Sequence, residues 1–148
     1  MKIIDTKPFP ASRECDEIVN IPLYRICKVK QIVNLSNYKN IIFQSPSAVI
    51  NFDQINLIED KRIIAMGPGT SNQLRKHGYV AEIPDTEYSS EGVINLINKS
   101  EVTGKTLVIK GEGGLSIISE YLNSASLKAD ELNTCLLYTS DAADDGLC

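Results

Sequence analysis

Several residue types and patterns that mark specialised proteins are missing from this sequence. Tryptophan is absent, histidine occurs once, at His77, and no apolar run approaches the ~20 residues that span a bilayer. The N-terminus also lacks the apolar core of a signal peptide. We therefore expect a cytoplasmic protein that makes no contact with a membrane.

The cysteines lack the spacing of a metal site. Cys15, Cys27, Cys135 and Cys148 form no CxxC pair, and His77 lies far from all of them in the sequence. We therefore expect no bound metal, and in a reducing compartment we expect free thiols.

An excess of basic residues is also missing. The 148 residues include 15 Lys and Arg against 19 Asp and Glu, which gives a net charge of −4. Because phosphate neutralisation drives affinity for nucleic acids, we expect no nucleic-acid partner. The composition, with 43% hydrophobic and 23% charged residues, is typical of a globular chain of about one domain, and we expect a monomer.

Apolar patterns alternate along the chain from Lys39 onward. Short runs rich in Ile and Val predict strands at 40–44, 62–66, 79–83 and 105–109, and we expect a further strand to begin within 130–134. Apolar residues at helical spacing predict helices at 46–55, 70–77, 89–98 and 115–122. Strands that alternate with helices over short connections form right-handed βαβ units. The pattern therefore predicts an α/β fold, with an open, mostly parallel sheet and helices on both faces.

This pattern bounds one α/β domain at residues 36–134. Residues 1–35 contain a short strand candidate at 2–6 and an extended segment at 18–26, in which Pro22 favours an edge or linker strand. These residues do not complete a domain. We interpret them as the remnant of a first domain together with an extended linker, so the first domain is expected to be incomplete.

The last segment, CLLYTSDAADDGLC, differs from the rest of the chain. It is acidic and rich in small residues, so we expect it to leave the sheet pattern. It also resembles the conceptual translation of sequencing-adapter read-through. We therefore interpret residues 135–148 as a non-native tail; the alternative is a natural acidic tail.

Three strand-to-helix junctions share one design. Ser45 and a proline follow the first predicted strand, Gly67-Pro68-Gly69-Thr70 follows the second, and Lys110-Gly111-Glu112-Gly113-Gly114 follows the strand at 105–109. In a parallel sheet these junctions share the carboxyl edge, where open α/β folds bind ligands. Each junction offers unpaired backbone N–H groups and the positive end of a helix dipole. Together they predict a binding site for a ligand with several anionic groups.

A purely structural interpretation of the same residues stays open. Ser45, Thr70 and Ser89 are of the types that cap helices, and the glycines permit tight turns. GxGxxG, Walker A and GxSxG motifs are all missing, and His77 beside Gly78 fits a helix end. The site that we expect is therefore built for positioning and charge complementarity rather than for acid–base chemistry.

These segments resemble the uroporphyrinogen-III synthases. Thr6-Lys7-Pro8 is similar to the family's opening Thr-Arg-Pro, and IIFQSPSAVINF is similar to its Phe-(Thr/Ser)-Ser-x-x-Ala-Val segment. IIAMGPGTSNQLRKHGY resembles the family's Gly-x-x-Thr helix, IPDTEYSSEGVINLI the segment after it, and TLVIKGEGG the strand with its glycine turn. The resemblance covers most of residues 39–122.

The resemblance implies two α/β domains of flavodoxin-like topology around a cleft, joined by a two-stranded linker. It also implies a reaction of haem biosynthesis, in which hydroxymethylbilane loses hydroxide and closes to uroporphyrinogen III with its terminal ring inverted. The family uses no metal and no cofactor. On this resemblance the chain is a truncated enzyme that covers the linker and the second domain, and we expect it to be inactive alone.

The resemblance also implies roles for individual residues. Thr70 would be the catalytic residue, because it would contact the substrate and assist the departure of hydroxide. The family's cleft tyrosine falls on Cys135 and is not carried over. The candidates for binding the substrate's carboxylate arms are Ser45, Gly67, Ser89, Ser90, Lys110, Gly111 and Gly113.

Two other functional hypotheses remain open. One is a non-catalytic, flavodoxin-like module that binds a phosphorylated or otherwise polyanionic ligand at the same junctions. The other is a fragment with no function of its own. Ligand choice among a nucleotide, a flavin and a porphyrinogen-type polycarboxylate would separate the first of these from the synthase.

Overall fold

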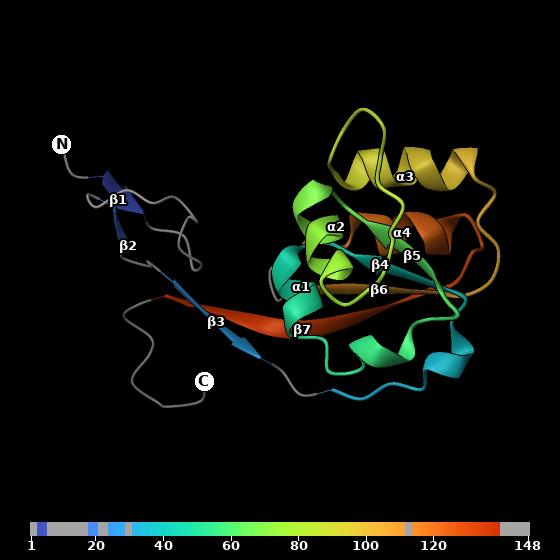
Figure 1. Cartoon of the computed structure of the whole chain (residues 1–148). Coiled ribbons are helices and arrows are strands. Elements are labelled where there is room, and N and C mark those ends of the chain that lie inside the picture. Colours follow the sequence, from blue (N-terminus) through green and yellow to red (C-terminus); the bar gives the residue numbers. More distant parts are fainter. Residues whose placement is uncertain (1–2, 6–17, 21–23, 29–30, 112–113, 140–148) are drawn as a thin grey trace.

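The computed structural model describes residues 3–5, 18–20, 24–28, 31–111 and 114–139, and its main feature is a five-stranded sheet (Figure 1). The strand order is β3-β7-β6-β4-β5. Strands β4 to β7 are mutually parallel, and only β3 runs antiparallel, along β7. The mostly parallel sheet predicted from the sequence is confirmed. The strand bounds are β3 (Tyr24–Lys28), β4 (Asn40–Phe43), β5 (Arg62–Ala65), β6 (Thr106–Gly111) and β7 (Ala129–Thr139).

A separate two-stranded sheet lies near the N-terminus. Strand β1 (Ile3–Asp5) pairs in parallel with β2 (Ile18–Asn20). Both strands fall inside segments that the sequence predicts to be extended.

The order of strands reverses direction at the centre of the larger sheet. Strand β4 pairs with β5 on one side and with β6 on the other, and Phe43 lies opposite both Ala65 and Ile109. The chain thus moves outward from β4 to β5 and then returns across β4 to form β6. The carboxyl ends of β4 and β6 therefore form the topological switch point, which is where doubly wound sheets bind ligands.

Helices cover both faces of the sheet, as the sequence predicts. Alternate residues of β4 face opposite ways, so Phe43 packs in one core with α1 (Pro46–Ile50) and α2 (Pro68–Arg75). Ile42 packs in the other core with α3 (Ser90–Lys99) and α4 (Ile117–Ser124). The principal helix residues in these cores are Ala48, Val49, Leu74, Val93, Ile97, Ile118 and Leu122, all at most 2% exposed.

Two predicted elements are shorter in the structure. The helix expected over 46–55 ends at Ile50, and its C-cap Asn51 donates its side-chain amide to the Ser47 carbonyl, at 2.8 Å. The chain then turns so that Phe52 meets Phe43 edge-on, with ring centroids 5.7 Å apart, and a 3₁₀ turn follows at Ile55–Leu57. The strand expected at 79–83 is reduced to one parallel bridge, between Ile64 and Glu82.

The expectation that the sheet pattern ends at Thr134 is wrong. Strand β7 continues to Thr139, and its last five residues pair with β3, with Cys135 opposite Lys28 and Thr139 opposite Tyr24. The reason lies in the composition, because the run CLLYT is apolar and β-prone and the acidic stretch begins only at Asp141. Residues 140–148 lie outside the described residues, and a non-native origin for 135–148 stays a prediction.

A polar cluster joins the amino ends of β6 and β7. The Tyr38 hydroxyl donates to Asp130 at 2.6 Å, and the Lys105 ammonium lies 2.7 Å from the same carboxylate and 5.2 Å from the centre of the Tyr38 ring. Burial, together with the hydrogen bond to Asp130 and its negative charge, raises the pKa of Tyr38 to about 12. Tyr38 follows the 3₁₀ turn η1 (Leu35–Asn37), so the cluster ties the segment that leads into β4 to the sheet.

Replacing Tyr38 by phenylalanine tests this cluster through pH. Because the pKa of Tyr38 is raised in the folded state, its contribution to the free energy of unfolding is complete below the ordinary value of about 10 and is lost as the pH rises towards the folded value. We expect the stability advantage of the wild type over Tyr38→Phe to be level near neutrality and to shrink above about pH 10. Urea unfolding at a series of pH values measures this, and an advantage that is constant into strong alkali would contradict the assignment.

Gly92, in the first turn of α3, leaves no room for a side chain. A Cβ built there would lie 1.7 Å from the Glu87 carbonyl oxygen, whereas at Gly69 in α2 it would lie 3.6 Å from the Pro46 ring. We expect Gly92→Ala to lower the free energy of unfolding by ~1–3 kcal/mol, as overpacking does. Gly69→Ala, the matched control, should be neutral or gain up to ~1 kcal/mol from helix propensity. Denaturant unfolding measures the change in the free energy of unfolding for each variant. A change of the same sign in both variants would contradict this account.

Candidate functional site

The carboxyl ends of the three central strands lie at one level. Gln44 donates its backbone N–H to the Ile109 carbonyl at 3.1 Å, and Met66 donates to the Phe43 carbonyl at 3.0 Å. The Gln44 side chain also reaches across to the Leu115 carbonyl, at 3.2 Å. The three junctions predicted from the sequence are therefore neighbours along one edge of the sheet, at the switch point between β4 and β6.

Two of the helices at this edge are capped by their own serines. Ser45 accepts a hydrogen bond from the Ala48 N–H at 3.2 Å, and Ser89 accepts one from the Gly92 N–H at 3.1 Å. Both serines have the extended backbone that is usual for an N-cap. The Ser45 hydroxyl also lies 3.1 Å from the Ser47 hydroxyl. The structural interpretation of Ser45 and Ser89 as helix caps is thus confirmed. The Ala48 N–H in α1 and the Gly92 N–H in α3 are therefore already hydrogen-bonded.

The other two helices begin without a side-chain cap. Gly67, which has no side chain to offer, precedes α2, and Ser116 precedes α4 without bonding that helix's backbone. Each helix has eight residues, so its dipole and its first-turn N–H groups can act on an anion. Tyr88, 57% exposed, stands over Gly67, and its Cβ lies 3.3 Å from where a Gly67 Cβ would sit.

Thr70 and Ser90 are more buried than their predicted roles suggest. Thr70 lies in the first turn of α2 and is 4% exposed, and Ser90, the first residue of α3, is 7% exposed. Within the described part of the chain, no residue forms a hydrogen bond with the Thr70 hydroxyl. A ligand would have to lie directly against the first turn of α2 to reach it. Gly111 ends strand β6 at the same edge, and Gly113 lies outside the described residues.

Lys110 is buried at the end of β6, with 7% of its side chain exposed. Its ammonium donates to the Gly114 carbonyl at 3.1 Å and to the Ser116 hydroxyl at 2.9 Å, and it lies 3.1 Å from the Glu131 carboxylate. An ammonium has three donors, and these contacts use all of them. The Lys110 side chain therefore has no free donor to offer to a ligand in this structure.

Glu131 completes this cluster from the neighbouring strand, β7. Its carboxylate accepts a short hydrogen bond from Ser119, whose hydroxyl also lies 3.0 Å from the Ser116 carbonyl. Burial acts to raise the pKa of Glu131, but hydrogen bonds from Ser119, Ser116 and Lys110 outweigh it and hold that pKa below its usual value. The carboxylate is thus charged at neutral pH, as the buried ammonium requires.

Sequence reasoning missed Glu131, Ser116 and Ser119. One signal was present, because a lysine at the end of the run TLVIK, in a strand expected to be buried on both faces, needs an acidic partner. The alternation in ADEL identifies a polar position on the next strand, but only the register, which places Leu107 to Lys110 opposite Asp130 to Asn133, shows that Glu131 is close enough.

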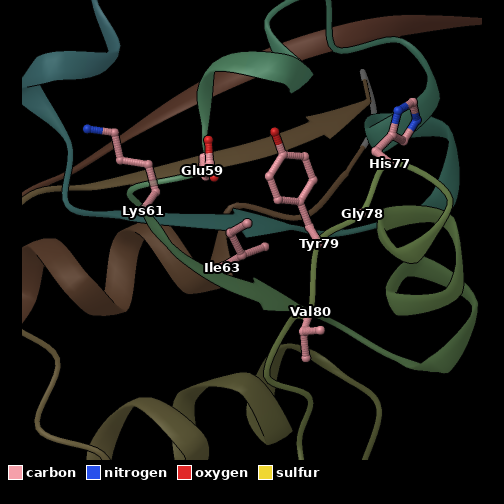
Figure 2. Close-up of a pocket in the computed structure, with 7 residues that line it drawn as sticks. All are labelled: Glu59, Lys61, Ile63, His77, Gly78, Tyr79 and Val80. Atoms are coloured by element: carbon pink, nitrogen blue, oxygen red, sulfur yellow. The ribbon is translucent and has the colours of Figure 1, made fainter.

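A separate hollow of about 420 Å³ opens at the amino end of β5. Figure 2 shows Tyr79 standing between Glu59 and His77, with Lys61 extending away from them. The hollow lies at the end of β5 opposite to the junctions, and none of the predicted site residues lines it. The lining residues are Glu59, Lys61, Ile63, His77, Gly78, Tyr79 and Val80.

Metal sites and membrane-spanning helices are both absent from the described residues. No group of His, Cys, Asp or Glu side chains among them is arranged to hold a metal ion. Within the same part of the chain, no helix is both long enough and apolar enough to cross a membrane.

Solved structures of similar fold include two uroporphyrinogen-III synthases. The crystal structure of a uroporphyrinogen-III synthetase from Helicobacter pylori matches with a TM-score of 0.65 at 14% identity, over 94% of this chain and 62% of that one. A mutant uroporphyrinogen-III synthase from Thermus thermophilus matches with a TM-score of 0.60 at 11% identity, over 83% of this chain and 54% of that one. The chain thus spans a little over half the length of these two structures. No curated protein matches it in sequence.

The sequence itself carries a family signature across nearly its whole length. A family model described as uroporphyrinogen-III synthase HemD matches residues 16–143, which includes the whole five-stranded sheet and the helices on both of its faces. The structural matches agree with it in fold. This chain belongs to the uroporphyrinogen-III synthase family.

Proposed function

We propose that this chain provides the linker and one substrate-binding domain of a uroporphyrinogen-III synthase, and that the carboxyl edge of its sheet binds hydroxymethylbilane. The observation that carries this proposal is the pair of uncapped helices, α2 and α4, which begin after β5 and β6 and so flank the carboxyl end of β4. Their first-turn N–H groups suit carboxylates, which are the charged groups of this substrate.

The proposed site requires no strong general base. The substrate's hydroxymethyl C–O bond breaks, hydroxide leaves and takes up a proton as water, and a resonance-stabilised cation remains. The terminal ring attacks this cation through an already substituted carbon, and the resulting spiro intermediate fragments and recloses with that ring inverted, losing a proton. Because the substrate closes to another isomer by itself, the protein's task is to hold the chain of rings in the productive arrangement.

We propose roles for the side chains from the resemblance to the family, together with their positions. Thr70, in the first turn of α2, would hydrogen-bond the departing hydroxide, and its hydroxyl has no described partner to give up first. Ser45 would accept its Ala48 cap bond while donating its own proton to a carboxylate, because a hydroxyl can do both. The backbone around Gly67, Gly111 and Gly113 would hold further carboxylates.

Ligand choice tests this function directly. Uroporphyrin III, the oxidised polycarboxylate product, is fluorescent, so its binding to the purified chain can be followed by titration, with FMN and ATP in parallel. We expect uroporphyrin III to bind and the other two not to bind. Binding of FMN or ATP without uroporphyrin III would instead favour a flavodoxin-like module for a phosphorylated ligand.

We expect the chain alone not to catalyse the cyclisation. It spans 62% and 54% of the two matched structures, and a flexible ligand that meets only part of its binding surface is not fully ordered. Incubation with freshly made hydroxymethylbilane, followed by oxidation and separation of isomers, should give the no-protein yield of the type III isomer. A yield well above that control would show that this domain suffices.

Thr70→Val separates a catalytic role from a structural one. The change keeps the shape of the side chain and removes the hydroxyl. In an enzyme completed with the rest of a synthase, we expect turnover to type III to fall at least ~10-fold, which is about 1.4 kcal/mol in the barrier. If turnover per folded molecule stays level while stability drops by ~1 kcal/mol, Thr70 is only part of the helix start.

A further inference from the structure

The buried Lys110 cluster changes the role that the sequence suggests for this lysine. A lysine at the end of a central strand, beside a glycine-rich turn, resembles a ligand for a substrate carboxylate. In the structure, however, its three contacts come from the Gly114 carbonyl, the Ser116 hydroxyl and the Glu131 carboxylate. Only 7% of the Lys110 side chain is exposed. A ligand could therefore bind the ammonium only by breaking one of these buried contacts.

Ser116 shows what the cluster achieves. Ser45 and Ser89 have extended backbones and cap their helices, whereas Ser116 has φ −91° and ψ 14° and does not cap α4. Its hydroxyl accepts from Lys110 and contributes to the hydrogen bonding of Glu131 instead. The first turn of α4 is therefore held in place by Lys110 and Glu131, while its N–H groups receive no side-chain cap.

We propose that Lys110 is a positioning residue: together with Glu131 it fixes the segment from Gly114 to Ser119, engages the Ser116 hydroxyl and so leaves the N-terminus of α4 open for a substrate carboxylate. The part that concerns the carboxylate rests on the proposed function. The part that concerns the 114–119 segment stands on the contacts alone.

The two roles for Lys110 predict opposite effects of Glu131→Gln. If Lys110 binds the ligand, removal of the competing carboxylate frees the ammonium and strengthens the binding of uroporphyrin III. If Lys110 acts by positioning, the same substitution breaks the pair that holds α4, and we expect binding to weaken by at least ~10-fold, or 1.4 kcal/mol. The matched control is Glu120→Gln, which removes an exposed charge from the first turn of α4. This substitution should not weaken binding.

Hydrogen exchange in the free protein tests the positioning role without any ligand. We expect backbone amides in 114–119 to exchange faster in Lys110→Met and in Glu131→Gln, while a peptide covering α2 is unchanged. If either single variant does not fold, the double variant Lys110→Met with Glu131→Gln removes both charges, so that no buried ammonium is left without its carboxylate. Unchanged exchange in 114–119 in a folded variant overturns the positioning role.

The two readouts keep the two proposals apart. If the wild type fails to bind uroporphyrin III but exchange in 114–119 responds to the substitutions, the proposed function fails and the positioning role stands. If the wild type binds and Glu131→Gln binds more tightly, Lys110 is a ligand and the positioning role fails.

Discussion

The rest of this structure depends on one constraint, the burial of four parallel strands between two layers of helices. Parallel strands that are covered on both faces must all leave the sheet in the same direction, so every strand-to-helix connection in the domain meets at one edge. In this chain Gln44, Met66 and Lys110 lie at one level along that edge. The same constraint makes a charged residue at the end of a central strand costly, which is why Lys110 needs Glu131 from the next strand.

The sequence allows the fold to be predicted further than the site. Ile41, Ile42 and Phe43 form a continuous apolar run, and such a run indicates a strand buried on both faces, as found. The end of α1 at Ile50 was not predictable from the sequence. Phe52 and Ile55 continue the apolar spacing of a helix, although in the structure they pack into the core from the loop and the 3₁₀ turn that follow it. The continuation of β7 past Thr134 was hidden because the acidic residues that follow dominated the composition of the segment.

The site could be predicted as a place but not as a set of contacts. Residue type alone identifies Ser45 and Ser89 as caps, and the structure agrees. Residue type alone makes Lys110 a candidate for binding a substrate carboxylate, but the structure engages its ammonium with Gly114 and Ser116. Residue type also gives no sign that Ser116, which precedes α4, leaves that helix without a cap. These two depend on strand register and on the path of the turn into α4, which are properties of the tertiary structure and leave only a weak trace in sequence.

The placement of α2 and α4 on opposite faces of the sheet has a consequence for the kind of molecule that this edge can distinguish. The two uncapped N-termini are separated by the thickness of the sheet, with the end of β4 between them. A ligand with a single carboxylate can engage one of them only, whereas a ligand with several flexible arms can straddle the edge and engage both. If the edge binds its ligand as proposed, it selects by valency, since the second arm binds at the high effective concentration that the first arm creates.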